Sequence, residues 1–173
     1  MKISWKTSAA GIAVILAAVI GINQFRVNTH AAEAMRYRDV SALAYYRYGV
    51  SPSSIVLDLR DVGPESSAAR TIGGLVDFAE NLSDREFDEV VLVWRGEARF
   101  ILGGDDFREM GRTASYQNPV YTIRTLPEKL RRPDGSRAFS VWTGGMIGVL
   151  GAQMDDVNDF AGQWYLDDAI AGR

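Results

Sequence analysis

The chain contains no cysteine and only one histidine, His30, among its 173 residues. A Ser-His-Asp triad, a Cys-His pair and a zinc site of His and Cys are therefore excluded from the chain beyond residue 30. Lysine is scarce as well, because Lys129 is the only one after Lys6. A Ser-Lys dyad would need Lys129, which lies in a charged segment that does not favour a desolvated, nucleophilic lysine. No nucleotide-binding or EF-hand motif is present, so we expect no metal and no cofactor.

Charged residues are also missing from residues 7–22, a largely apolar run. Lys2 and Lys6 precede this run and Arg26 follows it, which is the layout of a secretory signal or of a single membrane anchor. As a helix the run would span about 24 Å, or about 28 Å if it is counted on to Phe25, against a hydrocarbon core of ~30 Å. The order of charges favours an anchor in the inner membrane of a bacterium, with the following domain in the periplasm.

Two short patterns leave a cleaved secretory signal open as the alternative. Ala32-Glu33-Ala34 and Thr29-His30-Ala31 both have small residues at the two positions that signal peptidase reads. Cleavage there would release the protein into the periplasm, with Met35 or Ala32 as the new N-terminus.

The rest of the chain predicts a small α+β protein. We expect residues 1–30 to form the signal-anchor segment, residues 31–50 a helical stalk or first helix, and residues 51–173 a single α+β domain. Removing the first 34 residues takes away three positive charges and one negative charge, so the chain's net charge of −3 becomes −5. A net acidic domain argues against nucleic acid as a partner.

Hydrophobic periodicity predicts a sheet of about four strands with a central β-hairpin, covered by helices. The expected strands are residues 54–59, 89–94, 98–102 and 120–125, and the expected helices are residues 31–48, 65–82, 105–111 and 144–167. The last helix carries an apolar stripe at spacings of three and four, which predicts a buried face: Ile147, Leu150, Met154, Val157, Ala161 and Trp164.

The densest group of arginine and aromatic residues lies in residues 116–142. Arginine forms two-pronged bonds with carboxylates, and aromatic side chains often anchor protein interfaces. We therefore expect a binding groove made by Asn118, Tyr121, Arg124, Arg137 and Trp142. The structural alternative is that Tyr121, Phe139 and Trp142 are core residues, that Asn118 belongs to a turn, and that the arginines are solvated.

These observations favour a membrane-tethered, non-catalytic interaction domain of the bacterial envelope, such as a component of a complex or an inhibitor or immunity-type protein. A protein is the expected partner, and an anionic small ligand is a second candidate. The alternative is a carboxylate-dependent hydrolase that acts on an envelope polymer. Its acid and base would come from Asp58, Asp61 and one of Asp105 and Asp106.

Overall fold

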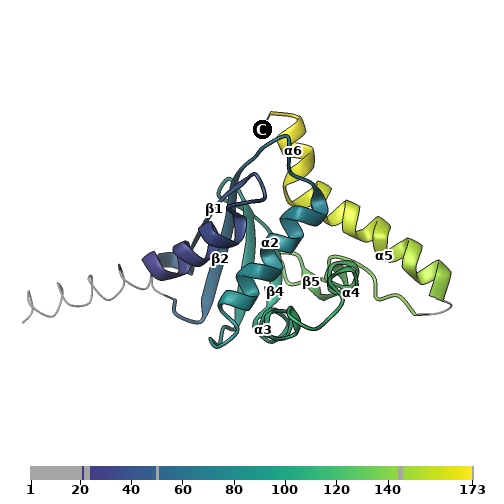
Figure 1. The fold of residues 1–173 in the computed structure, drawn as a ribbon, viewed down its shortest axis with the longest axis horizontal. Coiled ribbons are helices and arrows are strands. Elements are labelled where there is room, and N and C mark those ends of the chain that lie inside the picture. Colours follow the sequence, from purple (N-terminus) through teal and green to yellow (C-terminus); the bar gives the residue numbers. More distant parts are fainter. Residues whose placement is uncertain (1–20, 22–23, 50, 144–145, 173) are drawn as a thin grey trace, which may run out of the picture.

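The computed structural model describes residue 21 and residues 24–49, 51–143 and 146–172. These residues form an α+β fold around a five-stranded mixed sheet in the order β1-β2-β3-β4-β5 (Figure 1). β2 and β3 are parallel, and the other neighbouring strands are antiparallel. The strands are β1 (Val40–Tyr46), β2 (Ser54–Val62), β3 (Glu89–Trp94), β4 (Glu97–Gly103) and β5 (Leu130–Arg131).

Helices pack on one face of this sheet, where fully buried Leu57 of β2 and Leu92 of β3 join the main core. They are α2 (Ala68–Asn81), α3 (Gly104–Thr113), α4 (Pro119–Thr125), α5 (Met146–Ala161) and α6 (Asp167–Ile170), with short turns η1 (Arg47–Gly49), η2 (Pro127–Lys129) and η3 (Gly162–Leu166). The opposite face of the sheet holds a smaller cluster of Val56, Val91 and Val93. Both central strands are therefore buried on both faces, which explains why they are almost continuously apolar.

The segment before β1 is helical over residues 24–35 and belongs to the core, because Val27 and Ala31 are fully buried. Its polar side chains cover the outer edge of β1. The Gln24 side chain accepts the Tyr46 backbone N–H at 2.8 Å, and the Asn28 side chain accepts the Ala44 N–H at 3.1 Å. Four residues of helix rise ~6 Å and two residues of strand ~6.7 Å, so one helix face can follow one strand edge. The segment thus provides acceptors for N–H groups of β1 that would otherwise be unpaired at the edge of the sheet.

Two sequence predictions are wrong about local structure. The predicted helix over residues 31–48 ends at residue 35, and Val40–Tyr46 is strand β1. The predicted strand over residues 120–125 is instead helix α4, which starts with the Asn118 side chain as its N-cap and Pro119 in its first turn. The described sheet therefore has five strands rather than about four, because β1 and the short β5 were not expected.

The other predicted elements are confirmed. β3 and β4 form the expected hairpin through Arg95 and Gly96, whose φ angles of 48° and 90° fit a two-residue turn. Helix α2 contains two adjacent glycines, Gly73 and Gly74, and close packing accounts for them. A Cβ on Gly73 would collide with the Arg38 guanidinium, and one on Gly74 with the Met35 sulfur. Within the described residues no helix is long and apolar enough to cross a bilayer, and residues 7–20 and 22 of the predicted membrane segment lie outside them.

The C-terminal helix runs through α5, η3 and α6 without interruption, and η3 is a π-helical turn. This wider turn allows two adjacent aromatic residues, Trp164 and Tyr165, both to be buried. The Trp164 indole donates to the Val93 carbonyl at 3.2 Å, and the Tyr165 hydroxyl bonds the Thr71 hydroxyl at 3.1 Å. The second half of the helix is therefore fixed to both the sheet and α2.

Candidate binding surface and cavity

Helix α4 positions two of the predicted site residues next to each other. The Arg124 guanidinium lies 5.0 Å from the centroid of the Tyr121 ring and donates to the Gln153 side chain at 2.9 Å. Gln153, which is 5% exposed, donates in turn to Glu128 at 2.5 Å. Arg124 therefore holds α4 against α5, a structural role that the sequence did not predict.

The remaining predicted residues have separate positions. Asn118 is the N-cap of α4, and its side chain accepts the Val120 N–H at 3.0 Å. The Trp142 indole donates to Asp156 of α5 at 2.6 Å. Arg137 is exposed beyond the turn after β5 and lines a shallow hollow that Asp156 also lines. The structure thus brings Tyr121 and Arg124 together, and it places Arg137 in the same hollow as Asp156, which bonds Trp142. The described residues show no single groove formed by all five.

The aromatic residues Tyr121, Trp142 and Phe139 differ in their exposure to solvent. Tyr121 is 46% and Trp142 39% exposed, whereas Phe139 is buried among Phe100 and Phe160. The alternative that all three are core residues is therefore correct only for Phe139. Tyr121 and Trp142 remain available to a partner.

Further exposed apolar side chains gather on the same elements, and we call this set the α4–α5 surface. α4 contacts α5, and the first half of α5 projects beyond the sheet (Figure 1). Leu150 and Met154, which the sequence predicted to be buried, are 42% and 40% exposed on this half. The α4–α5 surface consists of Val120, Tyr121, Val141, Trp142, Leu150 and Met154. No feature of the sequence distinguishes Leu150 and Met154 from buried residues, because they continue the apolar stripe that is buried in the second half of the helix.

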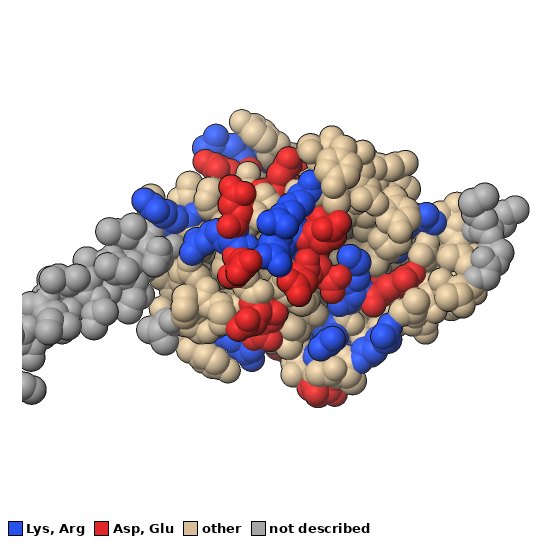
Figure 2. Space-filling model, turned by 90° about the horizontal axis from the view of Figure 1, so that it is seen from below, with Lys and Arg blue, Asp and Glu red and all other residues tan. Residues whose placement is uncertain are grey.

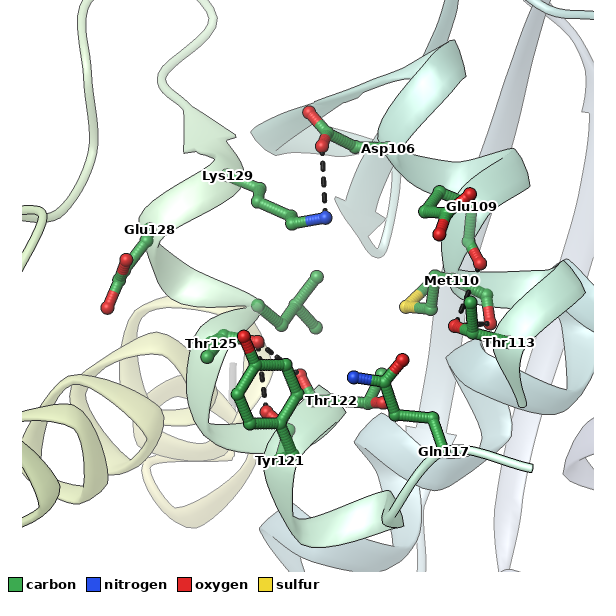
Figure 3. A pocket seen from close by; sticks show the side chains of 11 residues that line it. Asp106, Glu109, Met110, Thr113, Gln117, Tyr121, Thr122, Thr125, Glu128 and Lys129 are labelled. Atoms are coloured by element: carbon green, nitrogen blue, oxygen red, sulfur yellow. Dashed lines mark hydrogen bonds and ion pairs between the residues drawn. The ribbon is translucent and has the colours of Figure 1, made fainter. Parts of the chain in front are cut away.

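A cavity of about 340 Å³ lies between α3 and the α4–η2 segment (Figure 3). Met110 and Leu126, both nearly buried, supply its apolar wall, while Glu109 of α3 and Tyr121 of α4 lie on opposite sides of it. Lys129 and Asp106 close one end with an ion pair of 3.1 Å. Tyr121 is shared by the cavity and the α4–α5 surface.

Asp58 and Asp105, two of the carboxylates proposed for hydrolysis, lie toward different ends of the sheet. Asp58 is 2% exposed and accepts bonds from Arg60 at 2.8 Å and from the Gly96 N–H at 3.1 Å, so it fixes the β3–β4 turn. Burial, and then the charge of Asp58, raise the pKa of the neighbouring Tyr45 hydroxyl. Asp58 of β2 pairs with Val93, near the C-terminal end of β3. Asp105 comes just after Gly103 of β4, which pairs with Glu89 at the N-terminal end of β3.

Val93 and Glu89 are four residues apart on β3, which corresponds to about 13 Å at ~3.3 Å per residue. Glycosidase carboxyl groups lie ~5 to 9.5 Å apart, so Asp58 and Asp105 cannot act as such a pair. Asp106, Glu109 and Glu128 do line one space, the cavity described above. The described residues contain no group of three or more potential ligands that could hold a metal ion.

Acidic and basic side chains alternate over the face seen from below, without a large area of one sign (Figure 2). Many arginines of the described residues pair with nearby carboxylates, as Arg108 does with both Glu86 and Asp105. This face therefore does not resemble the basic surface that binds nucleic acid or anionic lipid.

Comparisons of the chain with family models, with curated proteins and with solved structures find no match. The function is therefore inferred from the residues and geometry of the chain itself.

Proposed function

We propose that the protein is a single-pass inner-membrane protein whose periplasmic α+β domain binds a protein partner through the α4–α5 surface. The observation that carries the proposal is the exposure of this surface, where six large apolar side chains remain accessible on α4, α5 and the chain before α5. Exposed large apolar side chains with polar neighbours are common at protein interaction sites. The domain's acidic net charge and its mixed ionic surface disfavour nucleic acid in that role.

A retained anchor is supported by the helical segment 24–35. Signal cleavage before Ala32 or Met35 would remove Gln24 and Asn28, which cover the edge of β1, together with buried Val27. The cleaved protein would lose part of its core and expose the edge of its sheet. The helical segment 24–35, which stabilises the domain, starts only two residues after the apolar run 7–22, so the sequence between them is too short for a long flexible stalk.

The end of the domain nearest the apolar run also suits a membrane surface. The Gln24 side chain donates to the Gly49 carbonyl at 3.1 Å, which brings the η1 turn beside the start of the helical segment. Phe25 and Tyr48 are 73% and 81% exposed there, and Arg47 lies over the Tyr48 ring at 5.2 Å. Aromatic and basic side chains are common at the interface between lipid and water.

The anchor is tested by carbonate extraction of membranes that contain the full chain, followed by measurement of its intact mass. We expect the protein in the membrane pellet with its apolar N-terminus present. A soluble product that begins at Ala32 or Met35 would contradict the anchor and support secretion.

The binding surface is tested by affinity capture with the full chain in detergent. Leu150→Glu places a charge on the α4–α5 surface, and Ile170→Glu makes the same change at an exposed residue of α6. We expect Leu150→Glu to lose the partner, and Ile170→Glu to retain it, with both variants folded. Equal capture by the two variants would contradict the proposal.

The hydrolase alternative retains one observation in its favour, the three carboxylates around the cavity. Asp106 is paired with Lys129 and Glu128 accepts a bond from Gln153, so both have structural partners. Hydrolysis of an isolated envelope polymer that is lost in Glu109→Gln would support this alternative over a binding role.

A further inference from the structure

The cavity between α3 and α4 has an acidic lining that calls for a positively charged occupant. Asp106 and Glu109 contribute carboxylates and Lys129 an ammonium group, whereas the Glu128 carboxylate is directed to Gln153 and points away from the cavity (Figure 3). Asp106 and Lys129 form an ion pair with each other, which leaves the negative charge of Glu109 unbalanced among the lining residues. Arg124 does not line the cavity, since its guanidinium is directed to Gln153.

The hydrogen-bonding groups of the lining point to the same chemistry. The Thr113 hydroxyl donates to the Glu109 carbonyl at 2.9 Å, and the Thr125 hydroxyl donates to the Tyr121 carbonyl at 2.9 Å. Each hydroxyl has given its hydrogen to its own helix, so its oxygen can only accept a further bond. Together with the Glu109 carboxylate, these oxygens provide acceptors for an occupant with several N–H donors.

The volume of the cavity and its position beside the α4–α5 surface indicate which molecule supplies the occupant. A volume of about 340 Å³ is at the lower limit for ligand pockets, which suits a single side chain rather than a large cofactor. Tyr121 stands at the boundary between the cavity and the α4–α5 surface, and its half-exposed ring can face a cation as well as a partner's apolar groups. A partner seated on the α4–α5 surface would have this cavity beside it.

We propose that the cavity receives an arginine or lysine side chain of the protein partner. The aliphatic stem would pack against Met110 and Leu126, and the cationic end would bond Glu109 and the hydroxyl oxygens of Thr113 and Thr125. This inference rests on the proposed function for the origin of the cation, and it adds the chemistry by which the partner is recognised. A buried basic anchor beside an apolar surface is a common form of interface hot spot.

The test uses the full chain in detergent, with methionine and threonine methyl groups labelled for NMR. Nα-acetyl-arginine amide is the probe, and Nα-acetyl-citrulline amide is its uncharged isostere. We expect the methyl signals of Met110 and Thr125 to shift with the arginine probe, with little response to citrulline. Met154, which lies outside the cavity, provides the reference signal.

Glu109→Gln should weaken binding of the arginine probe about fivefold, near the upper range for an ion pair that remains in contact with water. Glu80→Gln makes the same change at an exposed position of α2 and should have no effect. Equal shifts with both probes, no shift with either, or an unchanged affinity in Glu109→Gln would overturn the proposal. A response to citrulline and N-acetylglucosamine, without a preference for arginine, would indicate a neutral polar ligand instead.

The two proposals can fail separately. If Leu150→Glu abolishes partner capture while the arginine probe does not bind, the basic anchor is wrong and the binding surface remains. If the probe binds and Leu150→Glu does not affect capture, the cavity takes a cation but the partner does not use the α4–α5 surface.

Discussion

The two halves of the C-terminal helix have opposite relations to the rest of the protein. In the second half, Phe160 and Trp164 are fully buried, and their rings stack with a centroid distance of 5.3 Å. In the first half, Leu150 and Met154 continue the same apolar spacing but remain about two-fifths exposed. One apolar pattern in the sequence is therefore buried in one half of the helix and exposed in the other, because only the second half meets the sheet. We propose that the exposed half binds a partner.

The largest expected effect comes from removing a ring in the buried half. Trp164→Ala should destabilise the protein by ~3 to 5 kcal/mol, since it leaves a cavity and removes the bond from the indole to the Val93 carbonyl. Leu150→Ala should cost no more than ~0.5 kcal/mol, the usual limit for an exposed position. Chemical denaturation of the full chain in detergent measures both values. A similar loss of unfolding free energy in the two variants would show that both halves of the C-terminal helix contribute equally to stability, against our expectation.

The helical segment 24–35, near the other end of the chain, packs into the core as the second half of the C-terminal helix does. Gln24→Ala combined with Asn28→Ala should cost roughly 2 kcal/mol, since the N–H groups of Tyr46 and Ala44 lose their acceptors. The uncovered edge of β1 should also promote self-association, which light scattering would detect. Thr29→Ala lies on the same helix but removes only a bond to the Phe25 carbonyl, so it is the matched control. A stable, monomeric double variant would show that the segment is dispensable.

Substitution of Trp142 tests whether the exposed residues of the α4–α5 surface act in binding rather than in stability. It is 39% exposed and has one indole bond, so Trp142→Ala should cost only about 1 kcal/mol while it reduces partner capture strongly. Trp142→Phe separates the ring from the bond to Asp156 and should retain part of the capture. A loss of stability as large as that of Trp164→Ala would place Trp142 in the core instead.

The smallest effect is a change in the alkaline pH dependence of stability. Burial raises the pKa of Tyr165 above its ordinary value of 10.0, although its bond to Thr71 opposes this shift. The folded state therefore holds the proton more tightly than the unfolded chain. The stabilisation is complete below pH 10.0 and is lost as the pH rises through the folded-state pKa.

Tyr165→Phe should reduce this decline between neutral and alkaline pH, as measured by denaturation at several pH values. Tyr45 contributes a shift of the same sign, so some dependence should remain in the variant. An unchanged alkaline decline would show that Tyr165 does not contribute to it.

The sequence predicted the parts of the fold in which local pattern and tertiary packing agree. The apolar runs of β2 and β3, the turn at Arg95-Gly96 and the periodicity of α2 are of this kind. Strand β1 was missed because its alanine and tyrosine residues suit helix or strand, and the choice depends on pairing with β2 and on the side chains of Gln24 and Asn28.

Helix α4 was missed for the opposite reason. Its residues Val120 to Thr125 favour strand, but the Asn118 cap and the contact with Gln153 select a helix. Tyr121 and Trp142 could be singled out from residue type alone. The exposure of Leu150 and Met154, and the cavity around Glu109, could not, because they depend on how far α5 extends past the sheet and how α3 meets α4 (Figures 1 and 3).

Site-specific photo-crosslinking can show whether the exposed half of α5 is a docking site on a membrane-anchored protein, as we propose. A photoreactive amino acid is introduced at position 150 or 170 of the full chain, and native membranes are irradiated. We expect a discrete crosslinked product from position 150, which Tyr121→Ala weakens, and none from position 170. No product from position 150, or the same product from both positions, would contradict the proposal.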